Sequence, residues 1–295
     1  MDSSAAPTYT LSRLVDPLSE SQFLQLLAAR QPAYQRATIA GRYRDLWNWE
    51  MLLRAMSSGS SLANHLLVTR NESHVPPMFY SKGGDLDVKA LAGLMERGHS
   101  VLAKNLPMWS PEIRCLTMSI KARLRERIGA TAVASTGTGG ALRLHFDRCD
   151  VLALQLEGRK RWLIFDDPVP DPVSAGPNAS RRTEGTPVLD VTLSPGDYLL
   201  VPAGYWHRCL NGGDRSMHLA LLFYPPTAQN ILSAVARNLA GDPRFRRPFL
   251  RDSSNPRTRD AIAATRAQVI ERLQAMSDDE LIGAFVDQDD QLIDY

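Results

Sequence analysis

The chain has 295 residues, of which 44% are hydrophobic and 22% are charged, and its formal net charge is +2. This composition supports a sizeable folded core and excludes a largely disordered chain. The small net charge argues against a nucleic-acid-binding protein, which would carry a basic stripe.

The cysteines, the N-terminus and the apolar runs indicate the cellular compartment in which the protein is expected. Cys115, Cys149 and Cys209 stand at no metal-ligand spacing, which indicates a reducing compartment without a disulfide framework. The N-terminus lacks a basic segment followed by an apolar run, and no stretch approaches the ~20 apolar residues that span a bilayer. We therefore expect a cytoplasmic protein that does not bind membranes.

The N-terminal part of the chain favours helices. Apolar residues recur at helical spacing in 18–29 and 46–56, and residues 66–68 are typical of a short strand. Asp85 is a suitable N-cap for a helix that ends near Gly98. The sequence Ser110-Pro111-Glu112 predicts the start of a further helix, which we expect to continue to about residue 128.

Short β-favouring runs then alternate with turn residues. The runs are 132–135, 142–146, 151–156, 161–165, 188–193, 198–201 and 217–224. Turns are predicted at 137–140, 157–158, 195–197 and 211–213. Closely spaced strands without intervening helices predict an antiparallel sandwich or barrel.

The pattern returns to helix after the two prolines at 225–226. Helices are predicted at 230–239, 257–276 and 278–285, so we expect a helical lead-in region (1–130), a β core (131–226) and a C-terminal helical segment (227–295). The first of these helices carries an apolar stripe that its own segment is too short to cover, and we expect this stripe to form a homodimer. The alternative is that the stripe folds back on the β core. The stripe consists of Ile231, Leu232, Val235 and Leu239.

Three residues of the β core have the chemistry of a metal site. His145 and Asp147 are two positions apart, so on a strand or at its exit their side chains point to the same side. His207 follows a second strand, which a Pro-Gly-Asp turn introduces. Two histidines and one carboxylate on one face suit iron(II) that keeps open positions. The alternative is that these are ordinary polar residues of a β protein, since an H-x-D pattern alone is weak.

A basic segment follows the next predicted hairpin. Lys160 and Trp162 share one side of the expected strand, and Arg159 and Arg161 share the other. A buried cation would suit the distal carboxylate of a co-substrate such as 2-oxoglutarate, because an unpaired carboxylate is costly in an apolar pocket. We favour Lys160 pointing inward, with Arg159, Arg161 or Arg143 as alternatives.

With these motifs in place, residues 131–226 resemble the cupin-like JmjC family, closest in pattern to its ribosomal-protein oxygenases and to the asparaginyl hydroxylase of hypoxia-inducible factor. The matching motifs are His145-Phe146-Asp147, the strand 150–156, Glu157 to Trp162, Pro195-Gly196-Asp197 and Pro202 to His207. The resemblance implies a mostly β double-stranded β-helix (jelly roll). It also implies iron(II) bound by His145, Asp147 and His207, with 2-oxoglutarate and dioxygen as co-substrates. The resemblance further implies that Lys160 is the cation that binds 2-oxoglutarate, and that the reaction hydroxylates side chains.

The sequence departs from this pattern near the first histidine. Some relatives place a hydroxyl residue three positions before it, where this chain has Leu142. We expect Thr136 or Thr138 to supply a hydroxyl to the co-substrate site instead. His218, on the last predicted strand, is a further candidate for contact with the co-substrate, with a role as an ordinary core histidine as the alternative. His65, His74 and His99 lie outside the motifs and are expected to be structural.

Three functions are compatible with these features. The first is a hydroxylase of a protein or peptide side chain, which includes a ribosomally made peptide natural product as substrate. The second is a lysyl demethylase or a small-molecule or amino-acid hydroxylase on the same scaffold, and the third is a non-catalytic cupin-like binding protein. The long Pro- and Gly-rich segment 167–187, with its Arg181-Arg182 pair, is a candidate binding segment for an extended peptide substrate.

Overall fold

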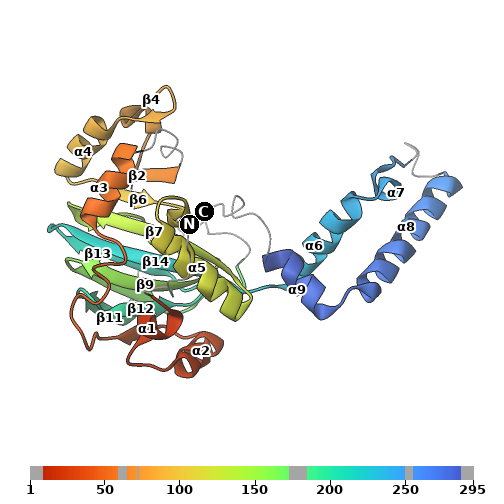
Figure 1. Ribbon diagram of the computed structural model, residues 1–295, viewed down its shortest axis with the longest axis horizontal. Coiled ribbons are helices and arrows are strands. Elements are labelled where there is room, and N and C mark those ends of the chain that lie inside the picture. The colour runs from red at the N-terminus through yellow and green to blue at the C-terminus, as the bar shows by residue number, and fades with distance from the viewer. Residues whose placement is uncertain (1–8, 59–64, 72, 173–184, 250–254, 287–295) are drawn as a thin grey trace, which may run out of the picture. The chain divides into compact units, whose positions relative to one another are not determined.

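The computed structural model describes residues 9–58, 65–71, 73–172, 185–249 and 255–286 (Figure 1). The chain divides into two compact units. Within the described residues, the first unit extends to Arg123 and includes Ile128–Tyr224, and the second contains Leu124–Arg127 and the residues from Pro225 onward.

The N-terminal part of the first unit mixes short helices with strands. Its helical elements are α1 (Leu11–Val15), α2 (Glu20–Ala29), α3 (Trp49–Ser58), η2 (Pro77–Phe79), α4 (Val88–Glu96), η3 (Leu106–Met108) and α5 (Pro111–Leu124). Its strands are β1 (Ala33–Gln35), β2 (Leu66–Arg70), β3 (Ser73–Val75), β4 (Ser81–Lys82), β5 (Asp85–Leu86) and β6 (Ser100–Ala103). Helix α2 begins where expected, because Ser19 and Gln22 form a capping box that satisfies its first backbone donors.

Two predicted helix ends were wrong. The N-cap of α4 is Asp87, whose side chain accepts from the backbone N–H of Ala90, whereas Asp85 lies in strand β5. Helix α5 stops at Leu124, and Arg125 adopts a left-handed conformation with φ of 55°. The chain then enters strand β7 (Arg127–Ser135), in which every residue is buried. Tertiary burial therefore outweighs the helical character of this segment.

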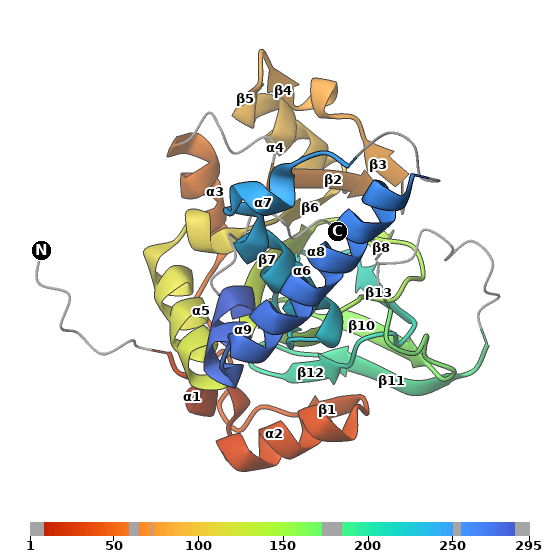
Figure 2. The ribbon, with the colours of Figure 1, turned by 90° about the vertical axis from the view of Figure 1, so that its right-hand side faces the viewer.

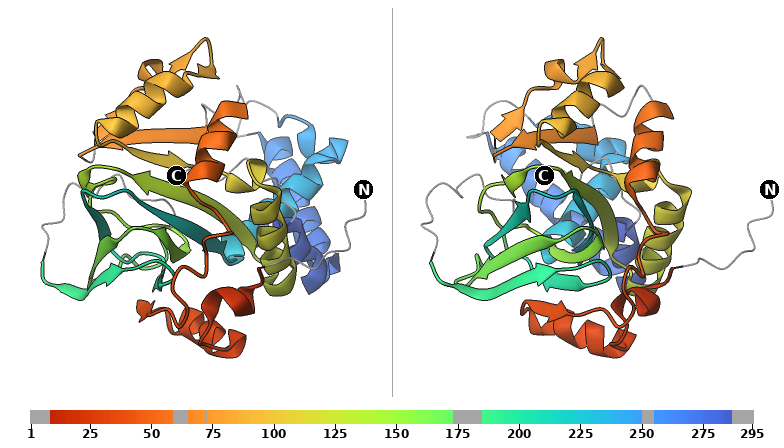
Figure 3. Two further views of the ribbon diagram at one scale, coloured as in Figure 1. Left: turned by 60° about the vertical axis from the view of Figure 1, so that its left-hand side comes forward. Right: turned by 90° about the vertical axis from the view of Figure 1, so that its left-hand side faces the viewer.

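The β core consists of two antiparallel sheets. Its strands are β7, β8 (Thr138–Gly140), β9 (Asp150–Glu157), β10 (Lys160–Phe165), β11 (Pro187–Leu193), β12 (Tyr198–Val201), β13 (His207–Gly212) and β14 (Ser216–Tyr224). The larger sheet has the order β1-β12-β9-β14-β7-β6-β2-β3, and the smaller has the order β11-β10-β13-β8. Figure 3 shows the strands of this core from two further sides. This arrangement confirms the expected jelly-roll core with added helices.

One apolar cluster joins the two sheets. Val151 and Leu199 of the larger sheet pack in the same buried cluster as Trp162, Ile164 and Leu193 of the smaller sheet. Burying a large apolar side chain of this kind contributes about 1.5 to 3 kcal/mol. The cluster thus holds β10 and β13, which carry the site residues described below, against the larger sheet.

In the smaller sheet, β10 and β11 lie where they were predicted, whereas the predictions for the neighbouring segments were wrong. Strands β8 and β13 occupy segments that were expected to contain turns at 137–140 and 211–213. Residues 142–146 were expected to be a strand, but His145 forms only an isolated bridge to His207. The glycines of β8 pair with β13, with Gly140 opposite Leu210 and Gly139 opposite Asn211.

The second unit is helical. It contains α6 (Ala228–Ala240), α7 (Pro243–Arg246), α8 (Pro256–Ala275) and α9 (Asp278–Val286), with α6 and α9 in contact (Figure 2). Val235 and Leu239 of the predicted stripe are buried, and Leu232 remains exposed, as do Ile262 and Ile270 on α8. In the described part of the chain, no helix combines the length and apolar character needed to cross a membrane.

Candidate metal centre and co-substrate pocket

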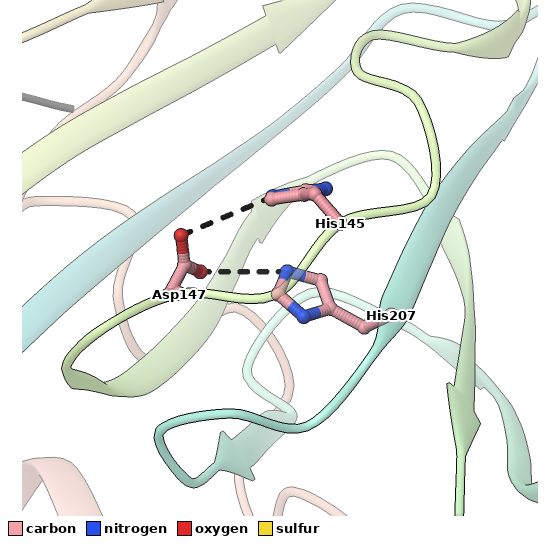
Figure 4. Close-up of side chains that lie close together, drawn as sticks. All are labelled: His145, Asp147 and His207. Atoms are coloured by element: carbon pink, nitrogen blue, oxygen red, sulfur yellow. Dashed lines mark ion pairs between the residues drawn. The ribbon is translucent and has the colours of Figure 1, made fainter. Parts of the chain in front are cut away.

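His145, Asp147 and His207 converge in space. His145 and Asp147 lie on the segment between β8 and β9, and His207 is the first residue of β13. The backbones of the two histidines exchange hydrogen bonds of 3.1 and 2.7 Å. Figure 4 shows the Asp147 carboxylate facing both rings, with Oδ1 4.0 Å from His145 Nε2 and Oδ2 3.5 Å from His207 Nε2. One ligand atom from each residue lies within 4.8 Å of the others.

Hydrogen bonds set the orientation of both rings. His145 Nδ1 lies 2.7 Å from the Arg143 carbonyl, and His207 Nδ1 lies 3.0 Å from the Tyr205 carbonyl. A carbonyl oxygen only accepts, so each Nδ1 carries the proton and each Nε2 keeps its lone pair for a metal. Burial, followed by the neighbouring His145, lowers the pKa of His207 to about 4, so its imidazole is neutral at pH 7.

The donor set fits a first-row transition metal. Two imidazoles and one carboxylate on one side leave other coordination positions open, which is the arrangement of non-haem iron(II) oxygenases. Among the described residues, no other group of three His, Cys, Asp or Glu side chains comes together in this way. The residues present are therefore suited to holding iron(II).

The turn before His207 supports the carboxylate ligand. The Gly204 N–H donates to the Asp147 carbonyl at 2.8 Å, and Asp150 Oδ1 accepts from the Ala203 N–H at 2.8 Å. Gly204 has φ of +85°, and a Cβ there would lie 2.0 Å from the Val169 carbonyl oxygen. The turn therefore requires glycine at this position.

We expect Gly204→Ala to lower both the stability of the protein and its affinity for metal. The added methyl group would force the turn away from Val169 and move the backbone that holds Asp147, at a cost of about 2 kcal/mol or more. Thermal unfolding and titration with Mn(II) measure the two effects. Gly212→Ala is the matched control, because no atom lies within 4 Å of a Cβ built there. Equal behaviour of the two variants would contradict this account of the turn.

A cavity of about 710 Å³ opens beside the metal ligands. Its wall includes Lys160, which is 2% exposed. Lys160 Nζ donates to the Val133 carbonyl at 2.8 Å and lies 3.1 Å from His218 Nδ1. No carboxylate of the described residues pairs with this ammonium group, and burial lowers the pKa of Lys160 to about 8. A buried cation without a counter-ion is suited to an anionic ligand.

The other cations that were considered lie outside this inner wall. Arg161 is exposed and pairs with Asp190 at 2.6 Å, and Arg159 is also exposed. Arg143 contributes to the cavity wall but remains exposed. The Arg181-Arg182 pair lies outside the described residues. The side chains of Lys160 and Trp162 are thus buried on the same side of β10, as expected from the alternation of side chains along a strand.

The structure does not bring the two predicted threonines to the cavity. Thr136 Oγ1 donates to the carbonyls of Met95 and His99, and Thr138 is exposed on β8. The hydroxyl groups of the cavity wall come instead from Ser73, Thr131 and Ser135. Sequence reasoning missed Thr131, because β7 was expected to begin only at residue 132.

Two further residues of the wall were not predicted to have a site role. Asn211, on the missed strand β13, lines the cavity, and its Nδ2 donates to the Gly137 carbonyl at 2.7 Å. His74, on β3, was expected to be structural but also lines the cavity. His218 is buried in the wall beside Lys160, and its contact with the co-substrate stays a prediction.

Comparison with known proteins agrees with this geometry. The bifunctional lysine-specific demethylase and histidyl-hydroxylase NO66 of Drosophila persimilis is 26% identical over 222 residues, covering 73% of this chain and 31% of that protein. Ribosomal oxygenase 1 of Rattus norvegicus is 26% identical over 221 residues, covering 72% of this chain and 36% of that protein. The chain thus spans about a third of the length of these two curated relatives.

A solved structure shares the fold. The ribosomal oxygenase YcfD of Escherichia coli, in complex with cobalt and 2-oxoglutarate, superposes with a TM-score of 0.57 at 18% identity, covering 92% of this chain and 72% of that chain. A model of the JmjC domain family matches residues 111–231, which include all three residues of the candidate metal centre. Over residues 111–231 this chain is therefore similar to the JmjC domain family.

Proposed function

We propose that this protein is an Fe(II)- and 2-oxoglutarate-dependent oxygenase that hydroxylates a side-chain carbon of a protein or peptide. The observation that carries the proposal is the convergence of His145, Asp147 and His207 on a cavity whose wall holds a buried lysine. The similarity to the JmjC domain family and the likeness to an enzyme solved with cobalt and 2-oxoglutarate support it.

Each group of the site has a defined task. His145 Nε2, His207 Nε2 and an Asp147 oxygen would hold iron(II), and the carbonyls of Arg143 and Tyr205 keep both rings in the required tautomer. Lys160 would pair with the C5 carboxylate of 2-oxoglutarate. Iron(II), 2-oxoglutarate and dioxygen together supply the oxidising chemistry, so no side chain is needed as a general base.

The cavity wall contributes by excluding water. Its apolar residues would leave a substrate carbon as the nearest oxidisable group. These residues include Leu67, Leu102, Val133, Leu144, Phe146, Val151 and Leu222. A site of this kind suits a carbon that carries no activating group.

The substrate class rests on the relatives. Their names record a histidyl-hydroxylase and ribosomal oxygenases, which supports a protein or peptide side chain as the target here. The test is to incubate Fe(II)-loaded protein and 2-oxoglutarate with peptide libraries, and to measure succinate and a mass gain of one oxygen. The His207→Ala protein is the blank. A mass gain only on a free amino acid or another small metabolite would overturn the peptide assignment, and no succinate with any substrate would favour a non-catalytic binding protein.

We also propose that the helical unit forms a homodimer. Leu232 on α6 and Ile262 and Ile270 on α8 are 59%, 50% and 50% exposed, and a second copy of the chain would cover such apolar side chains. We expect light scattering to give twice the chain mass at micromolar concentration, and Ile262→Glu with Ile270→Glu to give the monomer mass. The buried positions of α6 are left intact in that variant, so its fold is retained. A wild-type protein that is already monomeric would contradict the proposal.

A further inference from the structure

A histidine shares the inner end of the cavity with Lys160. His218, on β14, is 4% exposed, and its Nδ1 lies 3.1 Å from Lys160 Nζ. An ammonium group donates hydrogen bonds and cannot accept them, so Nδ1 must be the acceptor. The proton of the neutral ring is therefore on Nε2. The contact with Lys160 thus selects one tautomer of His218.

The same contact limits what Lys160 can offer to a ligand. The ammonium group has three N–H donors. The Val133 carbonyl takes one at 2.8 Å, and His218 Nδ1 takes a second at 3.1 Å. One N–H remains, and because two acceptors fix the position of Nζ, the direction of this last donor is fixed as well.

Trp162 packs between His218 and the metal ligand His207. The ring of Trp162 packs edge-on against His218 with centroids 5.1 Å apart, and stacks on His207 at 5.9 Å with an interplanar angle of 29°. Trp162 is 3% exposed. The three aromatic rings therefore form a continuous packed row from the metal ligand His207 to Lys160.

We propose that His218 is a positioning residue, which holds Lys160 Nζ through its Nδ1 so that the one remaining N–H faces the distal carboxylate of 2-oxoglutarate. This inference rests on the proposed function, because it takes 2-oxoglutarate as the ligand of Lys160. His218 acts through Lys160 and is not required to touch the reacting atoms.

The titratable groups around Lys160 do not change charge in the pH range in which Lys160 does, so a pH profile can report on Lys160. Cys209 on β13 is the other titratable group beside it, and burial raises the pKa of this thiol to about 11. Burial, and then Lys160, hold the pKa of His218 well below its usual value. Of these three groups, Lys160 is therefore the one that changes charge between pH 6.5 and 9.

Two variants separate hydrogen bonding from packing. His218→Leu removes the acceptor, whereas His218→Asn keeps an oxygen near the place of Nδ1. Titration of Mn(II)-loaded protein with 2-oxoglutarate at pH 7 should show about tenfold weaker binding for the leucine variant, because only the Val133 carbonyl then holds Nζ and the ammonium group must be ordered when the ligand binds. The asparagine variant should stay within about threefold of the wild type, and Mn(II) binding should change in neither variant.

The pH profile is the second measurement. The hydrogen bond to His218 stabilises the charged form of Lys160, so in the leucine variant the pH at which 2-oxoglutarate binding weakens should fall by about one unit. A purely structural role for His218 would not move this midpoint. The asparagine variant should restore it.

The outcomes are distinguishable. Wild-type binding in the leucine variant, or equal loss in both variants, would overturn the role of His218. Imidazole ¹⁵N spectra of the wild-type protein test the tautomer without any substitution, and a His218 ring protonated on Nδ1 would also overturn it. Unchanged 2-oxoglutarate binding in Lys160→Met would instead refute the co-substrate site of the proposed function.

Discussion

Replacement of His207 by alanine is expected to abolish turnover and to weaken metal binding by at least about a hundredfold, in line with the loss of a buried ligand. The variant keeps only His145 and Asp147 as ligands, and both lie on one short segment between β8 and β9. His207 is the ligand from the other side of the site, and its Nε2 faces Asp147 at 3.5 Å. Titration with Fe(II) under anaerobic conditions measures the affinity, and succinate release measures turnover.

The control for this variant is another histidine. His65 contacts Asn105 at 3.2 Å and does not contribute to the cavity wall, so His65→Ala should bind metal as the wild type does. Far-ultraviolet circular dichroism establishes that both variants are folded. Wild-type turnover in His207→Ala would remove the metal assignment, and with it the oxygenase proposal.

The fold could be predicted from the sequence where patterns are local. The β-favouring run from Val151 to Leu156 and the turn at Pro195-Gly196-Asp197 correctly placed β9 and β12. Strand β13 was missed because Asn211 and Gly212 are typical turn residues. Its strand conformation comes from pairing with β10, in which His207 lies opposite Ile164, and no local pattern encodes that long-range pairing.

The same division applies to the site. The structure brings together His145, Asp147 and His207, and the inward side of Lys160 follows from strand alternation. Hydroxyl residues lack such a pattern. The Thr136 hydroxyl is taken up by the carbonyls of Met95 and His99, which lie far away in the sequence. Thr131 reaches the cavity only because α5 ends early and β7 crosses its wall.

Replacement of Lys160 by methionine is expected to weaken 2-oxoglutarate binding by at least about a hundredfold. Methionine keeps the length of the side chain but leaves the distal carboxylate buried without a partner, which costs roughly 3 to 5 kcal/mol. The dissociation constant for 2-oxoglutarate on Mn(II)-loaded protein measures the effect. Arg161→Met is the matched control, because Arg161 is the next residue on β10 but is exposed and pairs with Asp190.

The charge of Lys160 also predicts how binding depends on pH. Burial lowers the pKa of Lys160 from 10.5 to about 8, so the free protein loses this proton as the pH rises above that value. The carboxylate binds the protonated form and raises the pKa of the lysine in the complex, so 2-oxoglutarate affinity should be constant below pH 8 and fall about tenfold per unit above it. Lys160→Met should show weak binding with no such decline between pH 6.5 and 9. If wild-type affinity were flat to pH 9, or if the methionine variant declined in parallel, the carboxylate would have to be held by another cation, and Arg143, which also contributes to the cavity wall, would be the next to replace.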